Sequence, residues 1–265
     1  MLQTFKNILK LIVPEQYRAD IKIFFKRFRY FGHFFYCPVC KSNVSHLQPL
    51  GYDIPVNHEK QIIGGGPRNA MCPVCGSSDR ERLLYLFIGQ KTNLFSKKTK
   101  LLHLAPERNL KRIFSKKKNI DYLTADLDPI NVMEAMDITQ IKYPNNTFDA
   151  IICNHVLEHI PNDQKAMDEL FRVLKPGGWA ILQVPISGNL KETFEDFSVT
   201  SPESREKVFG QKDHVRIYAK DYTDRLTSSG FKVKDFHWET DPAFGGEQEN
   251  KFVLYKKEIV YFCGN

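Results

Sequence analysis

The sequence of 265 residues contains no apolar run approaching the roughly 20 residues that a membrane-spanning helix needs. It also lacks the basic start, unbroken apolar core and small-residue cleavage site of a signal peptide. We therefore expect a cytoplasmic protein, in which cysteines serve as metal ligands or free thiols rather than disulfides. With no repeat or low-complexity tract, and with 42% hydrophobic and 26% charged residues, a disordered or fibrous chain is excluded.

Positive charge is concentrated in residues 1–36, which we call the basic leader. The whole chain has a net charge of +7, and seven basic against two acidic side chains give the leader +5 of this excess. Phenylalanines and aliphatic residues alternate with these charges, and Pro14 divides the leader into two short helical candidates. Two interpretations remain open: the apolar face packs on the rest of the protein, or it lies on an anionic membrane surface.

Two identical C-P-V-C motifs follow the leader. Cys37 and Cys40 form the first pair, and Cys72 and Cys75 form the second. Each motif places two thiolates in one tight turn, so the four sulfurs can complete a structural zinc shell. Reduced bystander thiols or an iron centre are the alternatives. We predict a small zinc-ribbon-like module over residues 37–77, with turn-rich composition and little regular structure.

Apolar segments alternate with helical ones in the remainder of the chain. Ser78 opens a capped helix, and short apolar strands separated by helices then predict a mostly parallel sheet with helices on both faces. We assign residues 78–265 to this α/β domain and expect Cys153 in a buried strand and Cys263 in the tail. The expected strands are 101–104, 122–125, 148–153, 179–184 and 231–236, and the expected helices are 78–90, 107–115, 162–174 and 220–229.

Acidic residues follow the predicted strands where an α/β sheet binds ligands. The strand 101–104 runs into a helix without the usual glycine-rich turn. Asp126 ends the next strand about 20 residues later, where a carboxylate can accept hydrogen bonds from a ribose diol. Asp137 and Ile138 pair an acid with an apolar side chain, a combination that suits the amino group and ring face of adenine.

Three further motifs occur in order: Y-P-N-N-T-F-D at 143–149, C-N-H-V-L-E-H at 153–159 and L-K-P-G-G at 174–178. With these motifs the chain resembles class I S-adenosylmethionine-dependent methyltransferases over roughly residues 100–240. The resemblance implies a doubly wound, mostly parallel Rossmann-like sheet with seven strands, one of them antiparallel. It also implies S-adenosylmethionine as the cofactor, beside a structural Zn²⁺ in the cysteine module.

The resemblance also implies which residues bind the cofactor. The first motif falls on His103, Ala105 and Glu107, where most relatives have an acid followed by alternating glycines. This departure implies a different approach to the methionine half of the cofactor. The other positions implied are Asp126 for the ribose, Asp137 and Ile138 for adenine, and Asn154 and His155 after the fourth strand of the domain.

The histidines allow more than one interpretation. His155, Glu158 and His159 spell the H-x-x-E-H pattern of inverted zinc proteases, but the pattern follows a strand between methyltransferase motifs, which is the wrong context. The alternative is that Glu158 and His159 form a hydrogen-bonded pair that fixes the turn, with His155 near the cofactor. His214 could act as a general base and Arg216 could pair with an anionic substrate, or both lie in an ordinary surface loop.

The predicted function is methyl transfer from S-adenosylmethionine to a small-molecule or glycan-like acceptor, with His155 and His214 as candidate catalytic residues. An RNA methyltransferase that holds RNA with the zinc module and leader is the alternative. A non-catalytic binding protein with a methyltransferase-like domain is the third hypothesis, because the first motif lacks glycines. We expect a cytoplasmic location, with peripheral membrane contact through residues 1–36.

Overall fold

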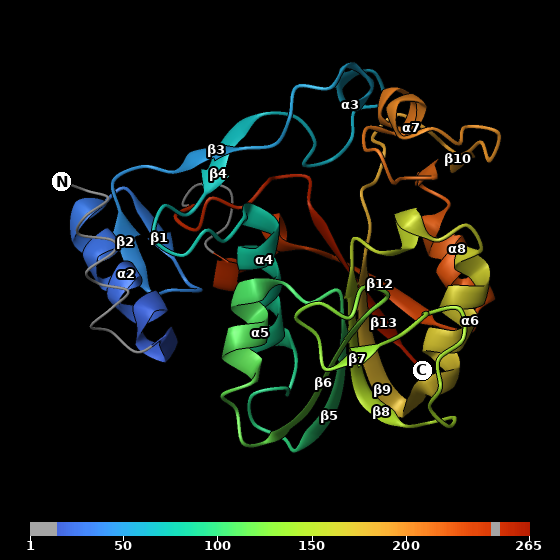
Figure 1. Ribbon diagram of the computed structural model, residues 1–265, viewed down its shortest axis with the longest axis horizontal. Helices are drawn as coiled ribbons and strands as arrows, with labels where there is room; N and C mark the ends of the chain where they lie inside the picture. The colour runs from blue at the N-terminus through green and yellow to red at the C-terminus, as the bar shows by residue number, and fades with distance from the viewer. Residues whose placement is uncertain (1–14, 245–249) are drawn as a thin grey trace.

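The computed structural model describes residues 15–244 and 250–265, and its centre is a seven-stranded sheet (Figure 1). The strand order is β12-β13-β9-β8-β5-β6-β7. Both pairings of β13 are antiparallel, and all other neighbours in the sheet are parallel. The strands are β5 (Thr99–Leu104), β6 (Ile120–Asp126), β7 (Glu134–Ala135), β8 (Phe148–Asn154), β9 (Leu174–Gln183), β12 (Lys232–His237) and β13 (Ile259–Gly264). This order confirms the predicted fold class.

Helices cover both faces of the sheet. Helices α4 (Asp79–Lys91) and α5 (Arg108–Phe114) lie on one face, and α6 (Asp163–Val173) and α8 (Tyr222–Ser228) lie on the other (Figure 1). The central strand β8 contributes Ile151 to one hydrophobic core and Ile152 to the other. Burial on both faces explains why β8 is continuously apolar instead of alternating. Two short 3₁₀ turns, η2 (Trp238–Thr240) and η3 (Pro242–Phe244), add Trp238 and Phe244 to the α4 side.

Local sequence signals set the helix boundaries. The Ser78 hydroxyl accepts a hydrogen bond from the backbone N–H of Glu81 at 3.0 Å, which confirms the predicted start of α4. Asn162 caps α6 in the same way, by accepting from Lys165 N. Cys263 lies in β13 and is fully buried, so the expected tail thiol is instead part of the sheet core. Its apolar neighbours pair with both β9 and β12, which brings this distant segment inside the fold.

The N-terminal part packs beside α4 and consists of short elements (Figure 1). Helix α2 begins the described chain. Two antiparallel strand pairs, β1 with β2 and β3 with β4, replace the irregular structure that the sequence predicted for residues 37–77. The buried Arg82 guanidinium of α4 donates to the carbonyls of Ala70, Ser77, Phe252 and Val253, joining the two parts. The elements are α2 (Glu15–Arg29), β1 (Phe35–Cys37), β2 (Ser42–Val44), β3 (Gln48–Leu50), α3 (Pro55–Glu59) and β4 (Arg68–Met71).

Two segments far apart in the sequence, residues 50–66 and 185–217, form what we call the roof. The second contains β10 (Phe194–Glu195), α7 (Pro202–Phe209) and β11 (Arg216–Ile217). The segments meet where Ile62 bridges Ser187 and where Val56 packs with Phe209 and Ile217. Figure 1 shows α3 and α7 side by side at one end of the molecule. Residues 50–66 therefore cover the α/β domain, although they precede it in the chain.

Candidate functional site

A chain of polar side chains crosses the carboxyl edge of three neighbouring strands. The His103 ring, fully buried on β5, hydrogen-bonds the Tyr122 hydroxyl at 2.9 Å and Glu107 Oε2 at 2.8 Å. Glu107 Oε1 accepts from Asn154 Nδ2 at the end of β8, at 2.7 Å. Three of the predicted cofactor residues, His103, Glu107 and Asn154, are therefore in direct contact.

The carboxylate of Glu107 is held in its ionised form. Burial alone would raise the pKa of Glu107. The hydrogen bonds from His103 and Asn154 lower it by more than burial raises it, so its pKa lies below the ordinary glutamate value. Burial likewise raises the pKa of Tyr122, which therefore remains a neutral donor to His103. A negative charge thus faces the space above the sheet from the first motif.

Two residues at this edge have left-handed backbone conformations. Ala105 has φ 44° and His155 has φ 54°, although neither is glycine. The Ala105 N–H donates to the carbonyl of Ala125 at 2.9 Å, and the His155 N–H donates to the carbonyl of Gln183 at 2.7 Å. These hydrogen bonds hold the turns in a conformation that favours glycine. Ala105 thus adopts a backbone conformation that favours glycine without being one.

Ala105→Gly should therefore stabilise the protein. Glycine removes the left-handed strain at a gain of about 1 kcal/mol, part of which the more flexible unfolded chain offsets. We expect a net stabilisation of roughly 0.5 kcal/mol in urea unfolding. Ala166→Gly, in the interior of α6, is the matched control and should destabilise by about 1 kcal/mol. A lower unfolding midpoint for Ala105→Gly would contradict the assignment of strain to this turn.

The predicted nucleoside residues lie further along the same edge. Asp126 ends β6, and its Oδ1 accepts from the backbone N–H of Asp128 at 3.2 Å. Asp137 is exposed and its pKa is lowered by hydrogen bonds from the backbone and the hydroxyl of Thr139. Ile138 is 5% exposed and packs in the core beneath the edge. The two carboxylates are thus accessible, whereas the Ile138 side chain points mostly into the sheet core.

A cavity of about 370 Å³ opens between this edge and the roof. Glu107, Asn154 and His155 line it from the sheet, and His214 and Phe209 line it from the roof. The three arginines that line it are already paired: Arg68 with Asp79 at 2.6 Å, Arg80 with Glu258 at 3.2 Å, and Arg216 with Glu195 at 2.7 Å. Asp126, Asp137 and Ile138 do not line this cavity. The edge and the cavity therefore adjoin each other at Asn154 and His155.

His214 is a buried residue and not part of a surface loop. It is 5% exposed, and its ring lies 4.7 Å from the His159 ring in a T-shaped arrangement. Burial lowers the pKa of His214 to about 4, so its imidazole is neutral near pH 7. Glu158 Oε1 lies 3.4 Å from His155 Nδ1, so Glu158 faces His155 instead of forming the expected pair with His159. The turn is a short 3₁₀ helix, η1 (Leu157–His159).

Arg216 lines the cavity, but its buried guanidinium is bonded within the protein. Its guanidinium is buried and donates to Glu195 Oε1 and to the carbonyls of Leu157, Ile160 and Pro161. These contacts hold the turn after β8 against β11. The expected pairing of Arg216 with an anionic substrate is therefore wrong, because the protein itself occupies its donors.

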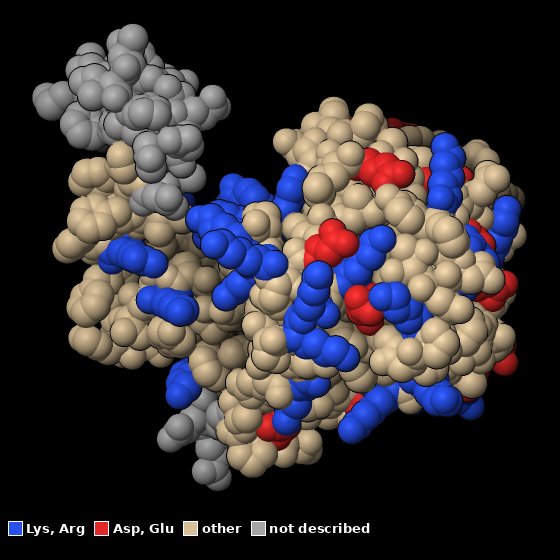
Figure 2. All heavy atoms as spheres, turned by 90° about the horizontal axis from the view of Figure 1, so that it is seen from below, with Lys and Arg blue, Asp and Glu red and all other residues tan. Residues whose placement is uncertain are grey.

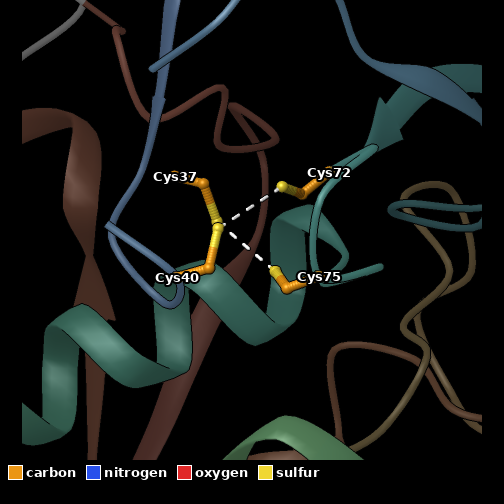
Figure 3. Close-up of side chains that lie close together, drawn as sticks. All are labelled: Cys37, Cys40, Cys72 and Cys75. Carbon is orange, nitrogen blue, oxygen red and sulfur yellow. Dashed lines mark hydrogen bonds between the residues drawn. The ribbon is translucent and has the colours of Figure 1, made fainter. Parts of the chain in front are cut away.

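The four cysteines of the C-P-V-C motifs converge beside α4 (Figure 3). Cys37 Sγ lies 3.7 Å from Cys75 Sγ, and Cys40 Sγ lies 3.8 Å from Cys72 Sγ. A tetrahedral ion with Zn–S bonds of about 2.3 Å would separate its sulfurs by about 3.8 Å. Hydrogen bonding with Cys40 lowers the pKa of Cys37 to about 7, and hydrogen bonding with Cys37 does the same for Cys72. The spacing fits a Cys₄ metal site.

Comparison with known proteins agrees with this geometry. Residues 101–182 match the family "Methyltransferase domain". The ubiquinone/menaquinone biosynthesis C-methyltransferase UbiE of Coxiella burnetii is 23% identical over 133 residues, which cover 45% of this chain and 49% of the relative. The chloroplastic 2-methyl-6-phytyl-1,4-hydroquinone methyltransferase 1 of Oryza sativa is 32% identical over 84 residues, covering 31% of this chain and 25% of the relative. The chain thus spans about half or less of the length of these relatives.

Among solved structures, an S-adenosylmethionine-dependent methyltransferase from Archaeoglobus fulgidus has a TM-score of 0.46 and 13% identity, covering 71% of this chain and 95% of the other. The family match over 101–182 and the strand order of the sheet together identify a class I methyltransferase domain. The family predicted from the sequence motifs is confirmed.

The sequence analysis missed one cluster of side chains, formed by Glu158, His159 and His214. His214 lies far from the other two residues in the sequence, and no spacing rule connects them.

Proposed function

We propose that the protein transfers a methyl group from S-adenosylmethionine to an uncharged small-molecule or glycan-like acceptor. The observation that carries this proposal is the cavity of about 370 Å³ beside the acidic strand edge. Its volume lies within the range of small-ligand sites, and it shares Asn154 and His155 with the edge. An accessible acidic edge next to this cavity supports a nucleoside cofactor on one side and a small acceptor on the other.

The residues present fit the cofactor at several positions. Asp126 would hold the ribose hydroxyls and Asp137 the adenine amino group, with Ile138 supporting the ring from below. Glu107 keeps its negative charge at the cavity wall and would pair with the methionine ammonium group. Asn154 Oδ1 is buried and has no hydrogen-bond partner among the described residues, so it can accept from the same ammonium.

When bound, S-adenosylmethionine supplies an electrophilic methyl group on a sulfonium. The task of the protein is then to orient the acceptor and exclude water. Roof residues such as Phe209 enclose the acceptor, and the paired arginines leave little free positive charge for a polyanion. His155, whose ring is 30% exposed beside the cavity, is our candidate for accepting a proton from the acceptor. His214 lines the same cavity from the roof and is the second candidate for this role.

The relatives support a small-molecule acceptor. They are methyltransferases of ubiquinone and menaquinone biosynthesis and of 2-methyl-6-phytyl-1,4-hydroquinone. An uncharged ring or sugar would suit a cavity that combines Leu83, Leu84 and Phe209 with a few polar groups. We therefore favour these acceptor classes over RNA, whose phosphates need unpaired cations.

Calorimetric titration with S-adenosylhomocysteine tests the cofactor half of the proposal. We expect one equivalent to bind with a dissociation constant in the micromolar range, about −8 kcal/mol. Absence of heat and of any thermal shift, in folded and zinc-loaded protein, would contradict the proposal and favour the non-catalytic binding protein. Acceptor candidates would then be screened by production of S-adenosylhomocysteine.

We further propose that the four cysteines bind one structural Zn²⁺. The sulfur spacing and the tethering of both motifs support this, since Arg27 donates to the Cys40 carbonyl at 2.7 Å and Arg108 to the Cys75 carbonyl at 3.0 Å. Four protein ligands leave a tetrahedral ion no open position, so the role is architectural. The expected cost of losing this ion is treated in the Discussion.

The basic leader supports a peripheral membrane contact. Ile23 and Tyr30 pack on the cysteine cluster, whereas Phe24, Phe25, Phe28, Phe31 and Phe34 are exposed by 55 to 77%. Figure 2 shows lysine and arginine side chains over the α2 end of the molecule. Exposed phenylalanines beside basic residues suit an anionic bilayer surface. Residues 1–14 lie outside the part of the chain that the structure describes. Among the described residues, no helix has the length and apolar character needed to cross a membrane.

Replacing Phe24, Phe28 and Phe34 together by serine should weaken binding to vesicles of phosphatidylserine and phosphatidylcholine roughly 10-fold or more, because less apolar surface enters the bilayer. Co-sedimentation at low salt measures the effect. Phe197→Ser is the matched control, since Phe197 is 55% exposed in the roof. Failure of the wild-type protein to sediment with these vesicles would end the membrane proposal.

A further inference from the structure

A second cluster of side chains with metal-ligating atoms lies apart from the cysteines, and one of its members, His214, lines the cavity. Glu158 and His159 belong to η1 after β8, and His214 comes from the roof just before β11. One ligand atom from each residue lies within 4.8 Å of the other two. Two imidazoles and a carboxylate are a donor set typical of divalent transition metals.

The cluster contains polar atoms that the protein leaves unpartnered. Glu158 is 1% exposed and His214 is 5% exposed. Glu158 Oε2 and His214 Nε2 have no hydrogen-bond partner among the described residues. Burying a carboxylate oxygen and a ring nitrogen without partners costs roughly 1 to 3 kcal/mol each. A bound cation would satisfy both atoms at once.

The surrounding contacts hold the three side chains in place. The Val215 N–H donates to the Glu158 carbonyl at 3.0 Å, and the Arg216 guanidinium donates to the carbonyls of Leu157, Ile160 and Pro161. His159 Nδ1 lies 3.3 Å from Asp213 Oδ2, and a carboxylate on one ring nitrogen fixes the orientation of a ligating histidine. The role of Arg216 is thus to join the two loops that carry the ligands.

We propose that Glu158, His159 and His214 bind one divalent transition-metal ion, such as Zn²⁺, at the wall of the cavity. Three protein ligands leave a tetrahedral ion one open position, as in catalytic rather than structural sites. His214 lines the cavity, so an oxygen of a bound molecule can reach this side. Metal binding at this site does not depend on the proposed methyl transfer, whereas coordination of a methyl acceptor would.

The H-x-x-E-H pattern is thereby explained without protease chemistry. In an inverted zinc protease the two histidines lie one turn apart on an α-helix, but here residues 157–159 form a 3₁₀ turn. His155, the first histidine of the pattern, contacts Glu158 Oε1 and is not a member of the cluster. His214, from a distant part of the sequence, takes its place beside Glu158 and His159. Tertiary contact, not the motif alone, thus completes the site.

Titration of the zinc-loaded full-length protein with Zn²⁺ tests the proposal. We expect a second equivalent to bind, beyond the one held by the cysteines, and Glu158→Gln and His214→Gln to weaken it roughly 100-fold. Glu203→Gln and His237→Gln, whose parent residues are exposed and lie outside the cluster, are matched controls and should leave both equivalents unchanged. Co²⁺ in this site should lack the thiolate charge-transfer absorption that marks cysteine ligation.

His159→Asn provides a second test if the buried substitutions prevent folding, because His159 is 29% exposed in its side chain. It should lose the second equivalent while keeping the first. If wild-type protein binds only one equivalent of Zn²⁺ in total, the one held by the cysteines, the proposal is overturned. A second equivalent that persists with unchanged affinity in these variants would overturn it equally, since the ion would then be bound elsewhere. Titration with S-adenosylhomocysteine is a separate readout, so failure here leaves the methyltransferase proposal unaffected.

Discussion

Asp126→Asn should weaken binding of S-adenosylhomocysteine by about 30- to 150-fold, or roughly 2 to 3 kcal/mol. Asp126 lies at the carboxyl end of β6, where its charge can accept two hydrogen bonds from a ribose diol. Asparagine retains the size of the side chain but loses the charge and one acceptor. Calorimetry at constant pH and salt measures the change directly.

Asp128→Asn is the matched control for this prediction. Asp128 is exposed two residues further along the same loop, and its Oδ1 accepts from the backbone N–H of Ile130 at 2.9 Å. Its replacement should change the affinity by less than about threefold, which corresponds to well under 1 kcal/mol. Unchanged affinity in Asp126→Asn would refute the assignment of the ribose-binding acid. Equal losses in both variants would indicate a nonspecific effect of charge at the edge.

Removal of the cysteine-bound metal should destabilise the protein by about 4 kcal/mol or more, lowering the melting temperature by roughly 10 °C. The two strand pairs β1–β2 and β3–β4 are short, and the buried cysteines form much of the core around them. Without an ion, the four cysteine side chains lie close together but lack the metal–sulfur bonds that would join the two motifs. Cys72→Ser should therefore abolish the tightly held equivalent of zinc and make residues 37–77 sensitive to protease.

Cys263→Ala is the control for the cysteine substitution. Cys263 is fully buried in β13 but lies outside the four-cysteine cluster. Its loss should cost only about 1 kcal/mol and leave the zinc content unchanged. A Cys72→Ser protein that retains a full equivalent of zinc and its melting temperature would contradict the structural role. The ion proposed for the cysteines also differs from the one proposed at Glu158, because only the former should show thiolate absorption after substitution with Co²⁺.

The sequence predicted those features that depend on neighbouring residues. The Ser78 cap, the apolar strands β5, β6 and β8 and the paired C-P-V-C motifs each need only a short stretch of chain to be recognised. Apolar periodicity and capping are local properties, so their physical signal survives without knowledge of the fold. The resemblance to methyltransferases added the number of strands and the single antiparallel one, and the strand order came from the structure.

Contacts between distant segments were decided by the tertiary structure. Packing of the roof buried His214 against Glu158, directed Arg216 to backbone carbonyls and enclosed the cavity with residues 50–66. Pairing of β13 between β9 and β12 likewise moved Cys263 from an expected tail into the core. The spacing of residues in the sequence does not predict such long-range contacts, because they depend on the combined packing of many side chains. The chain itself therefore determined the fold class and the candidate ligands, and packing determined which of these ligands face one another.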